Sequence, residues 1–151
     1  MRRRYRVIRQ EEQSDCGAAA LATVALHHRQ RVGLHALRDL AGTDQEGTNL
    51  LGLAEAAERL GFVAHAVHAT PAALTEVPLP AIAHTVTESG IAHFVVLFRV
   101  GRRKVTIGDP AVGVKKVSRK TFESEWTGNM LLLVPSDGMS SVRSSQRPTW
   151  R

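Results

Sequence analysis

Residues 9–29 read RQEEQSDCGAAALATVALHHR and contain Cys16, the single cysteine of this 151-residue chain. The thiol lies where a polar, acidic segment changes into an Ala- and Leu-rich run, and we predict a helix from Cys16 to about His28. A cysteine that serves only in packing would more naturally lie inside the apolar run. At a helix N-terminus, a thiolate is favoured by the helix dipole and by free backbone N–H groups. The stretch therefore indicates a nucleophile.

The composition predicts one ordinary domain, because about 150 residues of which 43% are hydrophobic can bury a real core. A single cysteine excludes an internal disulfide and a multi-cysteine zinc site, which is typical of a reducing compartment. No stretch approaches the ~18 consecutive apolar residues of a membrane-spanning helix, and the N-terminus lacks the apolar centre of a secretory signal. We expect a cytosolic chain that neither spans a membrane nor is exported.

The formal net charge of +6 comes from the two ends of the chain. Residues 1–9 contain five arginines and residues 139–151 contain three, without any acid, whereas residues 10–138 contain 12 Lys or Arg and 14 Asp or Glu. This pattern does not favour a nucleic-acid partner, which would require a basic face on the folded body. Basic ends suit an anionic membrane surface, an adjoining segment or simply solvated termini. We predict a basic segment at 1–9, one domain at 10–135 and a flexible tail or linker at 136–151.

The order of the periodic segments predicts an α+β fold in which N-terminal helices pack on a C-terminal antiparallel sheet. Two further helices are expected at 34–41 and 50–60, the second capped by Thr48 or Asn49. After Gly61 the spacing changes to short β-rich runs with turns between them. The expected strands are 62–67, 80–86, 92–100, 104–110, 113–117 and 130–134, with one short helix at 118–126 before the last strand.

A cysteine nucleophile needs a histidine base, and that histidine needs an acceptor that orients it. Among the seven histidines, His93 begins the most apolar strand, and the next strand ends at Asp109. If the hairpin is tight around 101–103, partner numbers sum to about 202–204, so position 93 faces roughly 109–111. The spacing therefore places Asp109 beside His93, while His84 remains a weaker candidate for the base.

An oxyanion stabiliser is the third element of such a site, and it is often a side-chain amide. Gln10 and Gln13 both precede Cys16. The residue pattern alone does not decide between them.

Four ordered motifs resemble the cysteine peptidase domain of bacteriocin-processing ABC transporters, over about residues 5–135. They are RQEEQSDCGAAALATVAL at 9–26, GTNLLGLAEAAERLGF at 47–62, AHFVVL at 92–97 and IGDPAVG at 107–113. The resemblance implies a papain-like fold. It also implies that Cys16 is the nucleophile, His93 the base, Asp109 the orienting acid and Gln10 the oxyanion-hole residue, with Gln13 as a neighbour.

The resemblance also implies a function, which is cleavage of a precursor peptide after a double-glycine motif at the cytoplasmic side of the cell membrane. The implied partners are the precursor with its leader and the membrane and ATPase domains of an ABC transporter. No metal and no organic cofactor are called for. Two alternatives stay open: a leader-binding module without useful turnover, and a transglutaminase-like acyltransferase that uses the same residues.

Overall fold

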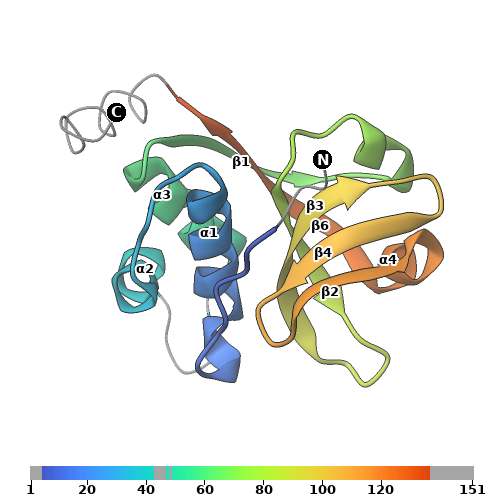
Figure 1. The fold of residues 1–151 in the computed structure, drawn as a ribbon, viewed down its shortest axis with the longest axis horizontal. Coiled ribbons are helices and arrows are strands. Elements are labelled where there is room, and N and C mark those ends of the chain that lie inside the picture. The colour runs from blue at the N-terminus through green and yellow to red at the C-terminus, as the bar shows by residue number, and fades with distance from the viewer. Residues whose placement is uncertain (1–4, 43–46, 48, 137–151) are drawn as a thin grey trace.

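The computed structural model describes residues 5–42, 47 and 49–136. The helices come first and one six-stranded sheet follows, so the predicted α+β architecture is confirmed (Figure 1). In chain order the elements are η1 (Gln13–Asp15), α1 (Cys16–His27), α2 (Leu34–Ala41), α3 (Leu50–Arg59), β1 (Phe62–His68), η2 (Pro71–Thr75), β2 (Ala81–Val86), β3 (Ala92–Val100), β4 (Lys104–Asp109), β5 (Gly113–Ser118), α4 (Arg119–Glu125) and β6 (Trp126–Pro135).

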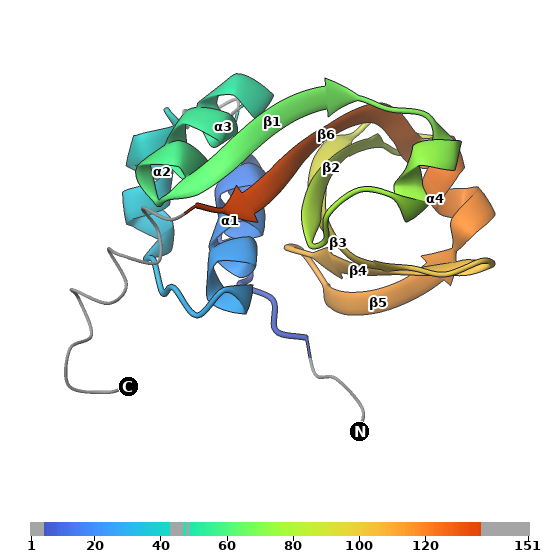
Figure 2. The same ribbon diagram turned by 90° about the horizontal axis from the view of Figure 1, so that it is seen from above.

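The first helix, α1, lies between the other two N-terminal helices and the sheet, and contacts α2, α3 and β3 (Figures 1 and 2). Every residue from Gly17 to Ala25 is buried. A helix that is surrounded by other elements carries apolar residues on all its faces, which explains why α1 is rich in alanine. At the start of α3, the Asn49 side chain accepts a hydrogen bond from the Gly52 N–H at 2.8 Å, as predicted for one of the two candidate caps. The other candidate, Thr48, lies outside the described residues.

All neighbouring strands of the sheet are antiparallel, in the order β1-β6-β2-β3-β4-β5. The predicted last strand at 130–134 was too short, because β6 begins at Trp126 and runs to Pro135. Its first part contains Thr127-Gly128-Asn129, which resembles a turn. Gly128 has a φ of 92°, and a Cβ atom there would lie 2.6 Å from the His68 ring.

The strongly curved sheet separates two hydrophobic cores (Figure 2). Phe94, Val96 and Phe98 of β3 pack towards α1–α3, whereas Val95 and Leu97 pack with α4 and η2 on the opposite face. A strand that is buried on both faces reads as a continuous apolar run, which explains the sequence FVVLF. Because His93 immediately precedes this rigid run, its position is fixed by the packing of both cores.

The first described residues run along the body of the domain. Tyr5, Val7 and Ile8 pack against the helical core, and the Ile8 N–H donates to Thr23 Oγ1 at 2.9 Å. These contacts with the helical core therefore involve residues of the predicted basic segment at 1–9. Apart from Ser136, the predicted tail lies outside the described residues. Across the described ranges, no helix combines the length and apolar character needed to cross a membrane.

Candidate active site

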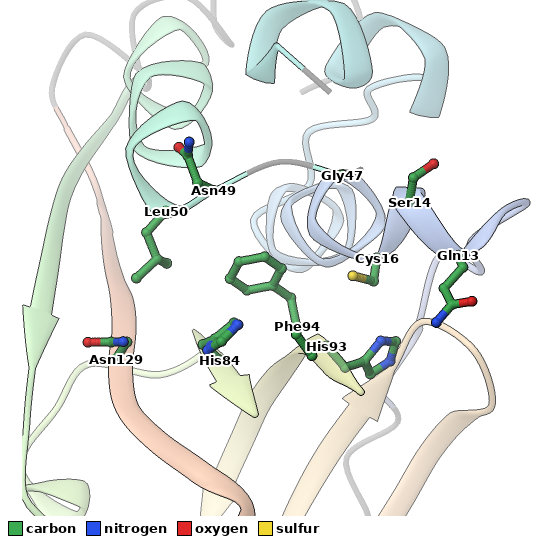
Figure 3. A pocket seen from close by; sticks show the side chains of 11 residues that line it. Gln13, Ser14, Cys16, Gly47, Asn49, Leu50, His84, His93, Phe94 and Asn129 are labelled. Carbon is green, nitrogen blue, oxygen red and sulfur yellow. The ribbon is translucent and has the colours of Figure 1, made fainter. Parts of the chain in front are cut away.

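Cys16 is the first residue of α1, and its thiol is only partly buried. It lines a cavity of about 490 Å³ between the helical layer and the sheet. In Figure 3 the Cys16 side chain lies above the His93 ring, which comes from the start of β3. The cavity is also lined by Gln13, Ser14, Gly47, Asn49, Leu50, His84, Ala92, Phe94 and Asn129.

His93 contacts both Cys16 and Asp109. Its Nε2 atom lies 2.7 Å from Asp109 Oδ1, and the ring is within hydrogen-bonding reach of the Cys16 thiol. With Nε2 directed at the carboxylate, Nδ1 is the nitrogen that is left to face the sulfur. The predicted adjacency of His93 and Asp109 is confirmed by this contact, while their catalytic roles stay predictions.

The strand register explains why His93 and Asp109 are neighbours. Val96 pairs with Gly108 and Leu97 with Ile107, so the numbers sum to 204 on this side of a bulge in β3. The same register places Asp109 diagonally across from His93, on the same face of the sheet. The Asp109 carboxylate is held further by the Ala111 N–H, which donates to Oδ1 at 2.9 Å, and by Lys115 Nζ, 3.3 Å from Oδ2.

The charges of the pair support each other. Burial acts to lower the pKa of His93, but the hydrogen bond to Asp109 and the contact with Cys16 outweigh it and raise that pKa from 6.5 to about 9. For Asp109, burial acts to raise the pKa, but the hydrogen bonds from His93 and Ala111 outweigh it and lower that pKa to about 2. An imidazolium next to an ionised carboxylate is therefore the stable state at neutral pH.

Both candidate glutamines lie at the site. Gln10 donates its backbone N–H to Pro110 O at 2.9 Å, and its side-chain Oε1 is buried and has no hydrogen-bond partner among the described residues. It lines a second cavity of about 420 Å³ on the far side of His93, which also contains Asp109. Gln13 is exposed and lines both cavities. Gln13 thus lines the cavity of Cys16, whereas Gln10 lines the cavity beside His93 and Asp109. The choice of Gln10 stays a prediction.

His84 has different surroundings. Its Nδ1 lies 3.1 Å from Thr127 Oγ1, its ring packs on Phe94, and burial lowers its pKa. Within the described ranges no carboxylate contacts this ring. His84 thus lies in the cavity of Cys16 without an orienting acid. The described residues also contain no group of three or more His, Cys, Asp or Glu side chains that could hold a metal ion.

Three charged residues at the site were not predicted from the sequence. Lys115 contacts Asp109, and Asp15 is fully buried beside Cys16 with Arg38 against its carboxylate. Asp15 directly precedes Cys16 in the sequence, but nothing in the local sequence indicates that its side chain pairs with Arg38 of α2. The register of β4 and β5, which opposes Ile107 to Lys115, could have indicated Lys115.

The model of the peptidase C39 family matches residues 4–138. The lactococcin-G-processing and transport ATP-binding protein LagD of Lactococcus lactis is 36% identical over 86% of this chain, which covers 19% of that relative. The transport/processing ATP-binding protein ComA of Streptococcus pneumoniae is 39% identical over 89% of this chain, which again covers 19%. The chain thus spans about a fifth of the length of these relatives.

Two solved structures are similar throughout the fold. The peptidase domain of Streptococcus ComA, a bifunctional ABC transporter involved in quorum sensing, has a TM-score of 0.82 and 34% identity, covering 88% of this chain and all of that one. A double-glycine-motif protease from an AMS/PCAT transporter, in complex with a leader peptide, has a TM-score of 0.79 and 33% identity, covering 88% of this chain and 96% of that one.

Proposed function

The chain belongs to the peptidase C39 family, and on this premise we propose that it is a cysteine endopeptidase that removes the leader of a bacteriocin-type precursor peptide after a double-glycine motif. The observation that carries the proposal is the continuous contact from Cys16 through His93 to Asp109 at the mouth of a cavity. A nucleophile, a base and an orienting acid in line are what peptide-bond cleavage by a thiol requires.

The proposed reaction has two steps. The Cys16 sulfur attacks the carbonyl carbon of the second glycine, and the amide of Gln10 stabilises the oxygen that becomes negative. His93, protonated at neutral pH, then donates its proton to the leaving nitrogen, which releases the mature peptide. Water, deprotonated by His93, hydrolyses the thioester and frees the leader. Throughout, Asp109 holds the ring through Nε2.

The substrate proposal is supported by the similarity to a double-glycine-motif protease that was solved with a leader peptide. A slot that leaves no space for a Cβ atom on the acyl side would restrict cleavage to glycine, and an amphipathic leader helix would supply apolar anchors for a groove. Leu50 and Phe94 give the cavity beside Cys16 an apolar wall of the kind such anchors need.

We also propose that the chain works with the membrane and ATPase domains of an ABC transporter, at the cytoplasmic side of the membrane. The support is that the relatives are transport and processing ATP-binding proteins of which this chain matches one fifth. Co-purification of the tagged chain with an ATP-binding transporter from membranes of its own cells tests this partner. Recovery of the chain without any transporter would contradict it.

The cleavage proposal is tested with synthetic precursors that have an amphipathic leader ending in Gly-Gly. Mass spectrometry should find one cut after the second glycine, and peptides with either glycine changed to alanine should stay intact. Cys16→Ala is the control, and it should abolish cleavage while retaining leader binding. Binding without any cut in the parent would favour the leader-binding module. Transfer of the leader to an added amine in place of hydrolysis would favour the acyltransferase.

A further inference from the structure

Asp15 is a buried charged residue that the reaction described above does not use. Its side chain is 0% exposed. One carboxylate oxygen, Oδ2, accepts the backbone N–H groups of Glu11 at 3.2 Å and Glu12 at 2.9 Å. The other, Oδ1, lies 3.0 Å from Arg38 Nε of α2, and this contact is an ion pair without an aligned hydrogen bond. A buried carboxylate is costly unless it is paired in this way, so its retention calls for a reason.

The contacts of Asp15 fix one end of a short loop, residues 10–15, which leads directly into Cys16. The other end is fixed by Gln10, whose N–H donates to Pro110 O at 2.9 Å, and by Arg9, whose guanidinium donates to Ala111 O at 2.8 Å. Pro110 and Ala111 directly follow Asp109. The loop is therefore held between the turn that carries the triad acid and the helix that carries Arg38.

Both glutamines that could stabilise the oxyanion lie on this loop. An amide that stabilises a tetrahedral oxygen must lie within a few tenths of an ångström of its productive place, because the benefit depends on preorganisation. Apart from the single turn of η1 the loop has no regular backbone hydrogen bonding, and so its place depends on side-chain contacts such as those of Asp15.

We propose that Asp15 and Arg38 are positioning residues, which hold the loop 10–15 so that a glutamine amide meets the oxygen formed on the carbonyl that Cys16 attacks. The inference rests on the proposed peptidase function. Asp15 is buried in the protein next to the nucleophile, and Arg38 supplies the positive charge that pairs with its carboxylate. Together they act on the transition state through the loop and not by contact.

The first experiment separates positioning from general damage. Asp15→Asn should lower kcat for a synthetic Gly-Gly precursor by about ten- to a hundredfold with KM changed less than about threefold, because the amide acts only in the transition state. Alkylation of Cys16 by iodoacetamide forms no oxyanion, and its rate should change less than about twofold. Asp39→Asn removes a charge from an exposed position of the same helix as Arg38 and should match the parent. Equal losses in alkylation and cleavage would overturn the proposal.

A double variant tests whether Asp15 acts through Gln10. In a Gln10→Ala background the donor is already absent, so Asp15→Asn should lower kcat by less than about threefold further. The same cycle with Gln13→Ala shows whether that amide is the one positioned. If Asp15→Asn lowers kcat by the same factor with and without each glutamine, Asp15 does not act through the loop that carries the two amides, and the proposal is refuted. Arg38→Gln should reproduce the Asp15→Asn pattern, and it keeps the proposal testable if Asp15→Asn does not fold.

Hydrogen exchange separates this inference from the peptidase proposal, since it needs no substrate. In Asp15→Asn and Arg38→Gln the amides of Glu11 and Glu12 should exchange at least about tenfold faster, while those in the middle of α1 stay as in the parent. If the parent cleaves no Gly-Gly precursor, the proposed function fails. Hydrogen exchange of the Glu11 and Glu12 amides still tests whether Asp15 and Arg38 hold the loop. Unchanged exchange at Glu11 and Glu12 in both variants would overturn the positioning role.

Discussion

Asp109→Asn should shift the pKa of His93 with little change in shape. The variant keeps an oxygen that can accept from His93 Nε2 and from the Ala111 N–H, so the loss is one of charge. The native pKa of about 9 against 6.5 for a free histidine corresponds to roughly 3 kcal/mol of preference for the protonated ring. Cys16 supplies part of this preference, and burial opposes it. We therefore expect the pKa to fall to about 7 in the variant.

The consequence for turnover depends on pH, because the reaction needs a protonated His93 for the leaving nitrogen. With a pKa of about 9 the ring is about 90% protonated at pH 8, whereas with a pKa of about 7 it is about 10% protonated. The kcat/KM ratio of parent to Asp109→Asn should thus be about nine times larger at pH 8 than at pH 6. A misoriented ring would add a further factor that is the same at both pH values.

Two measurements check this prediction. Precursor cleavage from pH 5 to 10 gives the alkaline limb of kcat/KM, which should lie near pH 9 in the parent and near pH 7 in Asp109→Asn. NMR titration of the His93 ring gives the same midpoints without substrate. Glu88→Gln, which removes an exposed carboxylate from the turn before β3, should leave both midpoints in place. A His93 midpoint that stays near 9 in Asp109→Asn would refute the assignment of the acid.

Three other predictions follow from the same site. Gln10→Ala should lower kcat for precursor cleavage by about 10²- to 10³-fold, whereas Gln13→Ala should lower it only slightly. The reverse order would assign the oxyanion hole to Gln13. His93→Ala should slow alkylation of Cys16 near neutral pH because the thiolate loses its positive neighbour, and His84→Ala should leave the rate nearly unchanged; an alkylation profile altered only by His84→Ala would reject the proposed base. The raised pKa of His93 stabilises the folded state fully below pH 6.5, and this contribution, up to about 3 kcal/mol, should disappear as pH rises through about 9. Urea unfolding at pH 6 and pH 10 should show the loss in the parent, and a His93→Gln variant should flatten it.

The helices and most strand positions could be predicted because their signals are local. Cys16 at the change from polar to apolar sequence, Gly42 after α2 and Asn49 before α3 each indicate a helix boundary within a few residues. The early start of β6 at Trp126 could not be predicted, since its Thr-Gly-Asn segment has the local sequence preference of a turn. Pairing with β1 and β2 on both sides holds that segment extended, and such pairing has no local signature.

The contact of His93 with Asp109 could be predicted because a tight hairpin converts sequence distance into register. The pairing of Asp15 with Arg38 could not, because a helix and a loop that meet through tertiary packing leave no fixed spacing. The two glutamines are an intermediate case. The sequence places them before the nucleophile, but which amide reaches the oxygen depends on how the loop is held.

The candidate site joins two parts of the fold that are built separately. Cys16 is positioned by the buried helix α1. His93 and Asp109 are positioned by strands of the sheet, which has a hydrophobic core on each of its two faces. The distance between sulfur and imidazole therefore depends on the contact of α1 with β3, and Phe94, adjacent to His93, is part of that contact. The segment 5–15 crosses the same boundary, since it bonds to Thr23 of α1 on one side and to Pro110 after β4 on the other. A change that loosens this segment would therefore misplace the oxyanion donor before it separates the nucleophile from its base.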